Sequence, residues 1–278
     1  MLRRVNRLLR PSLTTVLAAP LTLTLTLTLT PTPTPTPTPT QIPTPGPPHS
    51  PPDPPLNIVY VDTQLVVADK PAGLLCVPGR GPDKADCLSA RVMVRWPDAQ
   101  VVHRLDMATS GLVVLGRGAA VQRALSIAFA ERRVDKQYEA VVAGLVVDDS
   151  GEINLPLSAD WPNRPRQQID LAHGKPSLTR WCVLARDTAA GTTRLRLAPV
   201  TGRSHQLRLH MAAIGHAILG DALYAAPALA AAAPRLLLHA CGLAFDGPPS
   251  TGGPSTGGPS GPEEVDTTRL QFHSPSPF

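Results

Sequence analysis

Short runs rich in β-branched and other apolar residues recur along most of the chain, and they constrain its fold more than any other feature. We expect strands at residues 57–61, 64–68, 111–115, 137–143, 178–184, 192–199 and 235–245. Apolar residues at helical spacing occur at 88–96, 121–129 and 207–214. Because the strands come in groups and do not alternate regularly with helices, the pattern predicts an α+β domain. Its central sheet should be mixed and largely antiparallel, with flanking helices.

Residues 1–55 differ in composition from the rest of the chain. The start MLRRVNRLLR places apolar and arginine residues on separate helical faces, which is typical of an organellar transit peptide. The LT and PT repeats at 21–40 fit low-complexity sequence from a misplaced start codon equally well. Pro20 and the alternating threonines argue against a membrane span. We therefore expect a disordered leader over 1–55 and a folded domain over 56–278.

A second low-complexity segment lies at 248–264, where the motif STGGP is repeated. This segment has few side chains to bury, so we expect a flexible Gly/Pro insert on the surface. The chain resumes at 267–275 with the β-like run TTRLQFHSP, so the insert should connect two strands at the edge of the domain.

The formal charge of +5 gives weak support for a nucleic-acid partner, because the leader alone carries +3 and leaves +2 for residues 56–278. The cysteines form no CxxC pair and have no histidine at zinc-finger spacing. We therefore expect free thiols and no metal site at the cysteines, which are Cys76, Cys87, Cys182 and Cys241.

Polar residues crowd beside apolar runs in VVHRLDMATSGLVVLGR, at 101–117. Asp106 lies in a polar break between two β-like runs, so its carboxylate is expected at the rim of the sheet, facing a cleft. Aspartate is also a frequent turn residue, and Thr109 and Ser110 would suit a turn in which Asp106 only caps its own backbone.

A second polar cluster lies in VTGRSHQLRLHMAAIGHAILGDALYA, at 200–225. Thr201 is expected to cap the following helix, which places Arg203 in its first turn and directs Arg208 elsewhere. A cation at a helix N-terminus is electrostatically disfavoured, so Arg203 indicates a nearby anion, either a carboxylate or a phosphate. A solvated surface arginine is the alternative.

These segments resemble the signature blocks of the RluA-type pseudouridine synthases. The blocks HRLDMATSGL, KQYEA, TGRSHQLRLHM and GHAILGDALY occur in the family's order, and the resemblance covers 56–278 apart from the insert. DWPNRPRQ, GKPSLTRW and APRLLLHA resemble the branch that acts on tRNA and large-subunit ribosomal RNA. The resemblance implies an isomerase that needs no cofactor, works as a monomer on structured RNA such as the tRNA anticodon arm, and resides in the bacterial cytoplasm. The transit-peptide interpretation leaves a mitochondrion or plastid as the alternative.

The resemblance also implies roles for three residues. It makes Asp106 the catalytic aspartate, Tyr138 the active-site tyrosine and Arg203 the arginine that pairs with the carboxylate. Tyr138 would stack on the uracil and help to move the proton from carbon 5. Without the resemblance, Tyr138 would equally be a half-buried aromatic residue of a strand.

The family's substrate uridine must leave its base stack to reach a buried carboxylate. The resemblance implies that Arg104 fills the vacated stack. His103 would contact a phosphate or bond to the backbone, and the second is our expectation. Further basic residues would contact phosphates beside Trp161, or would simply be solvated loop charges. These residues are Arg164, Arg166 and Lys175.

The sequence departs from the family where Ala217 replaces a common proline, which loosens a turn without removing a catalytic group. Many relatives also carry a small RNA-binding domain before the catalytic one, where this chain has Pro/Thr repeats, so target recognition should depend on the catalytic domain.

Other functions fit the sequence less well. HRLD is also found in kinase catalytic loops, but a Gly-rich phosphate loop is missing, as are GxSxG and HExxH. The strongest alternative is a non-catalytic RNA-binding or RNA-chaperone module that retains the fold. The variant Asp106→Asn discriminates between an enzyme and a binding module. In an enzyme it should abolish modification and leave RNA affinity nearly intact.

Overall fold

A computed structural model describes residues 56–81, 84–247 and 268–278. The leader and the insert predicted from the sequence lie outside these residues. The helices are α1 (Leu88–Arg95), α2 (Ala119–Ala130), α3 (Gln206–Ala213) and α4 (Pro227–Ala231). The strands are β1 (Asn57–Val61), β2 (Leu65–Lys70), β3 (Ala99–Val101), β4 (Ser110–Arg117), β5 (Asp135–Ala143), β6 (Ser150–Asn154), β7 (Leu157–Ala159), β8 (Gln167–Ile169), β9 (Leu178–Asp187), β10 (Thr192–Pro199), β11 (Leu238–Asp246) and β12 (Arg269–His273).

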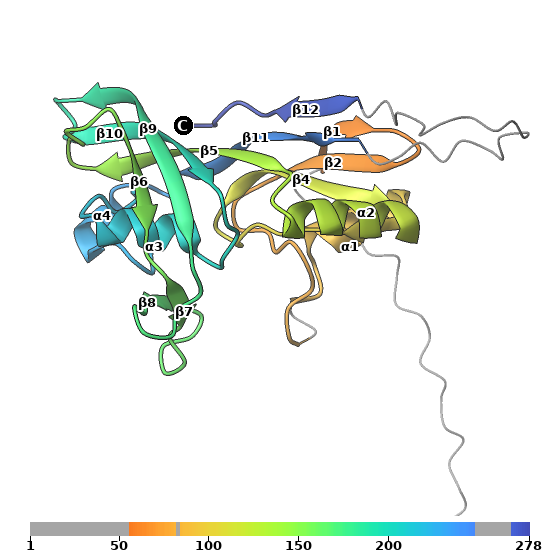
Figure 1. Cartoon of the computed structure of the whole chain (residues 1–278), viewed down its shortest axis with the longest axis horizontal. Coiled ribbons are helices and arrows are strands. Elements are labelled where there is room, and N and C mark those ends of the chain that lie inside the picture. The colour runs from red at the N-terminus through yellow and green to blue at the C-terminus, as the bar shows by residue number, and fades with distance from the viewer. Residues whose placement is uncertain (1–55, 82–83, 248–267) are drawn as a thin grey trace, which may run out of the picture. The chain divides into compact units, whose positions relative to one another are not determined.

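One sheet of ten strands forms the centre of the fold, in the order β1-β2-β4-β11-β5-β10-β9-β6, with β3 beside β4 and β12 beside β11. Among the described strands every pairing is antiparallel except that of β4 with β11. The predicted α+β class is therefore confirmed. Figure 1 shows α1 and α2 beside β2 and β4, and α3 and α4 toward the opposite end of the sheet, beside β6 and β9.

The core is built from the alternation of side chains along the strands. Leu65 and Val67 of β2 pack with α2, whereas Val66 and Ala68 pack with α1, so these helices cover opposite faces of the sheet. At the other end, Met211 of α3 packs against strands β5 and β10. The molecule thus has two packed halves that meet at the central strands, β5 and β11.

All the strands expected from the sequence form, and so does the short run after the insert, as β12 paired antiparallel to β11. The β-like run before Asp106 forms as β3, whereas β6, β7, β8 and α4, each three to five residues long, were not predicted. Runs this short carry too little apolar periodicity to be recognised.

Gly111 explains how the parallel pair of strands can approach so closely. It lies at the start of β4 with φ of +114°, and a Cβ there would come within 2.3 Å of the carbonyl oxygen of Ala240. Any other residue would push β4 away from β11. Because Asp106 lies in the segment just before β4, this contact also fixes the base of the loop that carries it.

Candidate active site

A cavity of about 510 Å³ opens where the two halves of the sheet meet. Its walls are the segment before β4, the end of α2, the side chain of Tyr138 on β5, and the segment that leads into α3. Three residues predicted to act together, Asp106, Tyr138 and Arg203, all line it. His103 and Arg104 line it as well, whereas Arg164, Arg166 and Lys175 do not.

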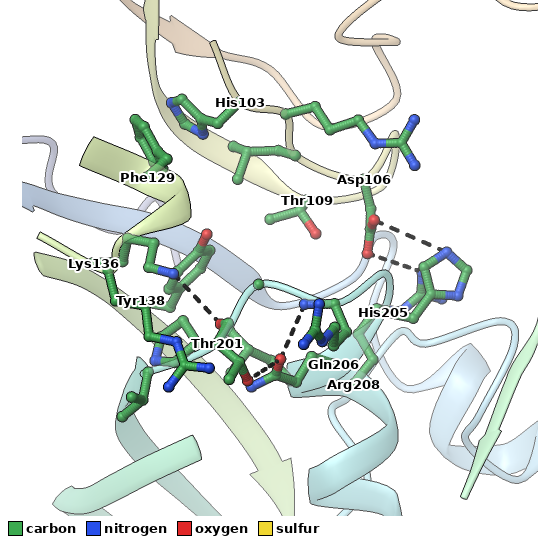
Figure 2. Close-up of a pocket in the computed structure, with 18 of the residues that line it drawn as sticks. His103, Asp106, Thr109, Phe129, Lys136, Tyr138, Thr201, His205, Gln206 and Arg208 are labelled. Atoms are coloured by element: carbon green, nitrogen blue, oxygen red, sulfur yellow. Dashed lines mark hydrogen bonds and ion pairs between the residues drawn. The ribbon is translucent and has the colours of Figure 1, made fainter. Parts of the chain in front are cut away.

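Asp106 presents a partly exposed carboxylate to two cationic or proton-donating groups of the facing wall (Figure 2). Nη1 of Arg208 lies 3.8 Å from one carboxylate oxygen and Nε2 of His205 lies 3.9 Å from the other. Thr109 donates its N–H to the backbone oxygen of Asp106, and within the described part of the chain the carboxylate accepts no hydrogen bond. The carboxylate therefore does not cap its own turn.

The arginine that faces Asp106 is Arg208, so the prediction that Arg203 pairs with this carboxylate is wrong. Arg203 is exposed and its guanidinium lies 3.4 Å from the carbonyl oxygen of Pro176. The physical reason is the start of the helix: α3 begins at Gln206, with His205 as its N-cap residue in the left-handed region at φ of +54°. Arg208, not Arg203, thus occupies the first turn.

Thr201 does not cap the helix but belongs to a hydrogen-bond network around Gln206. Its hydroxyl donates to Oε1 of Gln206 at 2.8 Å, and the same oxygen accepts the N–H of Arg203 at 3.0 Å. Nε2 of Gln206 donates to the carbonyl oxygen of Leu178. The single buried amide therefore fixes the path of 201–206, a role that the sequence analysis missed.

Arg208 is held by a second carboxylate, that of Asp221. Its Nε and Nη2 donate to the two oxygens of Asp221 at 2.8 and 2.6 Å, and both side chains are almost completely buried. Burial is the strongest single influence and would raise the pKa of Asp221, but the hydrogen bonds and charge of Arg208, together with the backbone N–H groups of Leu223 and Tyr224, lower the pKa overall. Asp221 therefore orients the guanidinium that faces Asp106.

Tyr138 lies on β5 opposite Leu197 of β10 and Ala240 of β11, at the floor of the cavity. Burial, together with the negative charge of Asp106, raises the pKa of its hydroxyl, so the phenol stays protonated at neutral pH. Lys136 lies two residues away, with Nζ 3.4 Å from the carbonyl oxygen of Thr201, and burial lowers its pKa.

His103 is bonded to the backbone, as expected. Its Nε2 accepts the N–H of Val114 at 3.0 Å, and its ring stacks on Phe129 with centroids 4.4 Å apart. Burial lowers the pKa of His103 to about 3, so the imidazole is neutral and does not offer a charge to a phosphate. Arg104, the next residue, is exposed at the rim of the cavity.

The basic residues expected in Pro-rich loops lie outside the cavity, around the β7–β8 hairpin. The guanidinium of Arg164 lies 3.2 Å from the ring centroid of Trp161, whose exposed fraction is 69%. Arg166 lies 5.5 Å from the ring centroid of Tyr224. Lys175 is exposed and pairs with Leu157 through its backbone.

Among the residues that the structure describes, no helix is long and apolar enough to cross a membrane. The same residues contain no group of three histidine, cysteine or acidic side chains that could hold a metal ion. All four cysteines are free thiols.

Comparison with known proteins identifies the family. A family model described as RNA pseudouridylate synthase matches residues 64–213. The chain is 51% identical over 198 residues to the dual-specificity RNA pseudouridine synthase RluA of Pasteurella multocida, covering 71% of this chain and 90% of the relative. The corresponding protein of Escherichia coli (strain K12) is 49% identical over 193 residues, covering 69% and 88%.

Solved structures agree with this match. Human RNA pseudouridylate synthase domain containing 1 superimposes with a TM-score of 0.63 at 28% identity, covering 80% of this chain and 84% of that one. Human RNA pseudouridylate synthase domain containing 4 shares the fold, with a TM-score of 0.60. The chain belongs to the RNA pseudouridylate synthase family. The RluA-type resemblance is confirmed, and with it the expectation of a pseudouridine synthase, an isomerase.

Proposed function

We propose that this enzyme converts specific uridines of tRNA, in the anticodon arm, and of large-subunit ribosomal RNA to pseudouridine, with Asp106 as the catalytic carboxylate. The relatives from Pasteurella multocida and Escherichia coli, both named as dual-specificity enzymes, support the choice of substrates. The observation that carries the role of Asp106 is its position: a carboxylate that lines a cavity, faces a buried arginine and accepts no hydrogen bond within the described chain.

The reaction exchanges one glycosidic bond for another. The bond from C1′ of the ribose to N1 of the uracil breaks, the base turns, and a bond forms between C1′ and C5. The proton on C5 leaves, and N1 takes up a proton, so no electrons are gained or lost. A carboxylate can attack C1′ or stabilise positive charge on the sugar, which are the two tasks open to Asp106.

Arg208 and Tyr138 support this chemistry from two sides. Arg208 stabilises the negative charge of Asp106 across 3.8 Å, in a site where burial strengthens the attraction. Tyr138 is protonated and lines the same cavity, so its ring can stack on the uracil while its hydroxyl takes part in the transfer of the C5 proton.

RNA would reach the cavity with its target base turned out of the helix. Arg104 is exposed at the rim, where its planar guanidinium can replace the base in the stack. Arg203 is also exposed and lines the cavity, so its guanidinium would contact phosphate. The remaining cations would bind the RNA backbone around the β7–β8 hairpin, next to the exposed ring of Trp161: Arg164, Arg166 and Lys175.

The enzyme would act as a monomer in the bacterial cytoplasm, and the relatives from Pasteurella multocida and Escherichia coli, both bacteria, support this compartment. A leader that directs it to a mitochondrion or plastid is the alternative. Gel filtration with and without RNA tests the first statement, and fractionation of cells that express a tagged chain tests the second.

The test of the function is pseudouridine mapping by carbodiimide on total RNA from cells lacking the protein, complemented with wild type or with Asp106→Asn. Sites restored by wild type alone establish the reaction and its targets. If no site depends on Asp106, the carboxylate is not catalytic, and the non-catalytic RNA-binding module becomes the better account. In that case the protein should still bind RNA, but no uridine should depend on it for its conversion to pseudouridine.

A further inference from the structure

His205 is the second group that faces Asp106, and the reaction described above does not use it. Its side chain is only 12% exposed, and it holds the left-handed backbone position that precedes α3. Histidine tolerates this conformation better than bulky apolar residues do, yet the position still costs backbone energy. The only other described residue besides glycine with positive φ, Arg132, also lines the cavity. Both strained positions are therefore in the site.

The other nitrogen of the His205 ring is bound by Tyr224. Nδ1 lies 2.8 Å from the hydroxyl oxygen of Tyr224, and the two rings meet edge to face with centroids 5.6 Å apart. The same hydroxyl oxygen accepts the backbone N–H of Gln167 at 2.7 Å. Because an amide can only donate, the hydroxyl must accept there, which leaves its own proton to donate to Nδ1 of His205.

This arrangement selects one tautomer of the imidazole. If Nδ1 accepts a hydrogen bond from the hydroxyl of Tyr224, the neutral ring carries its hydrogen on Nε2, and that hydrogen points toward Asp106. The opposite tautomer would aim a lone pair at a carboxylate 3.9 Å away, which is electrostatically unfavourable. Burial lowers the pKa of His205, more than the charge of Asp106 raises it, which keeps the ring neutral at physiological pH.

Tyr224 is itself held in place by the groups that hold Arg208. Its backbone N–H donates to Asp221 at 3.2 Å, and the guanidinium of Arg208 lies 5.3 Å from its ring centroid. The two groups that face Asp106 therefore share one support. Gln167 is the first residue of β8, so this support also connects to the hairpin loop that carries Trp161 and Arg164.

We infer that His205 is a positioning residue for Asp106, and that Tyr224 sets the tautomer of its ring so that an N–H donor faces the carboxylate. This inference rests on Asp106 being the catalytic carboxylate, as proposed above. The present separation of 3.9 Å is longer than a hydrogen bond, and such contacts often shorten when substrate fills a site. His205 then fixes one oxygen of Asp106 while Arg208 fixes the other.

The test compares His205→Leu, His205→Gln and Tyr224→Phe. Single-turnover release of tritium from RNA labelled at C5 of uridine measures the reaction, and filter binding measures RNA affinity. We expect the rate constant to fall by roughly 10- to 100-fold in His205→Leu, because a hydrogen bond to a charged group is lost. His205→Gln keeps an N–H donor and should recover much of the rate. Tyr224→Phe should lose about tenfold.

RNA affinity should change by no more than about twofold in all three variants, because a positioning residue acts on the rate and not on binding. Leu and Gln at position 205 carry the same left-handed backbone cost, so only the donor distinguishes them. Matched controls are His273→Leu on β12 and Tyr60→Phe on β1, both outside the lining of the cavity, and thermal unfolding checks that each variant is folded.

A spectroscopic measurement makes the tautomer visible independently of activity. In protein labelled with ¹⁵N-histidine, the ring shifts of His205 should show an unprotonated Nδ1 and a protonated Nε2, and Tyr224→Phe should weaken this preference. The opposite tautomer, or equal rates in Leu, Gln and wild type, would overturn the inference. If wild type itself releases no tritium, or Asp106→Asn is as active as wild type, the proposed function fails instead.

Discussion

The loop that carries Asp106 and the turn that carries Asp221 meet the same guanidinium in different ways. Asp221 is buried to 1% exposure and accepts two short hydrogen bonds from Arg208. Asp106 keeps 27% of its side chain exposed and lies 3.8 Å from Arg208 without a hydrogen bond. Arg208 therefore has two carboxylate partners: Asp221 holds it in place, and Asp106 remains available to react with a substrate.

The difference shows how a fold can keep a carboxylate ready to react. The side chain of Asp221 is buried and both of its oxygens accept hydrogen bonds from Arg208, so it cannot reach a substrate, whereas Asp106 is partly exposed in the cavity. The pair of Arg208 and Asp221 supplies the rigid part, and Asp106 approaches it from a separate loop, fixed by the close β4–β11 contact at Gly111. Substitution of Asp221 should therefore mainly lower the free energy of unfolding, whereas substitution of Asp106 should mainly lower the reaction rate.

Removing the structural carboxylate should have the largest effect on folding. Asp221→Asn leaves the buried charge of Arg208 with only a distant anionic partner, and breaking a buried ion pair of this kind costs about 3–5 kcal/mol. Urea unfolding measures the loss. Asp246→Asn, which loses an exposed contact with Arg269, should cost less than about 1 kcal/mol and serves as the control. Equal losses in the two variants would show that Asp221 has no special structural role.

Replacing the shared arginine by lysine should affect the reaction more than binding. Arg208→Lys keeps the charge but loses the two parallel hydrogen bonds to Asp221, so the cation is no longer aimed at Asp106. We expect the single-turnover rate constant to fall about 100-fold, which corresponds to about 2.7 kcal/mol. The control is Arg123→Lys, on the exposed side of α2. A rate close to that of wild type would show that charge alone suffices.

His103 should make stability depend on pH. Its pKa is about 3 in the folded protein and about 6.5 when unfolded, so its contribution is complete above about pH 6.5 and is lost as the pH falls toward 3. In His103→Gln the free energy of unfolding should fall less steeply over this range, by up to about 1.4 kcal/mol per pH unit. Unfolding at several pH values measures the slopes. Identical slopes would mean that His103 has the same pKa in the folded and unfolded states, which contradicts the lowered pKa.

The smallest effect on the reaction rate is expected from substitution of Arg203, and this result distinguishes the role of Arg203 from that of Arg208. Arg203→Ala should leave the single-turnover rate constant nearly unchanged and weaken RNA binding by a single phosphate contact. The slope of log affinity against log salt should then become shallower by about 0.7–0.9. If instead the rate collapses and the salt dependence is unchanged, Arg203 would be the partner of Asp106, contrary to the 3.8 Å contact between Asp106 and Arg208.

Local pattern was enough to predict much of this protein. The β-rich runs predicted β1 and β10 to the residue, and in β10 buried side chains alternate with more exposed ones along the strand. The polar break around Asp106 predicted a carboxylate facing a cleft, and Asp106 does line the cavity. These features depend on residues that are close in sequence, so the sequence shows them directly.

The identity of the cation facing Asp106 could not be predicted in the same way. Placing the helix start at Thr201 was reasonable, but the buried amide of Gln206 holds the preceding segment in a loop and delays α3 by a turn. The contact between Arg208 and Asp221 spans 13 residues, and that between His205 and Asp106 spans the two halves of the sheet. Such contacts depend on tertiary structure and leave no periodic signal.

The most direct test of the central claim uses purified Asp106→Asn, with asparagine chosen because it preserves size and removes the charge. Tritium release from C5-labelled RNA and RNA affinity are measured in the same preparation. The account predicts a loss of at least about 1,000-fold in rate, with affinity within about threefold of wild type and unchanged thermal stability. Retained activity, or a loss of affinity as large as the loss of rate, would contradict it.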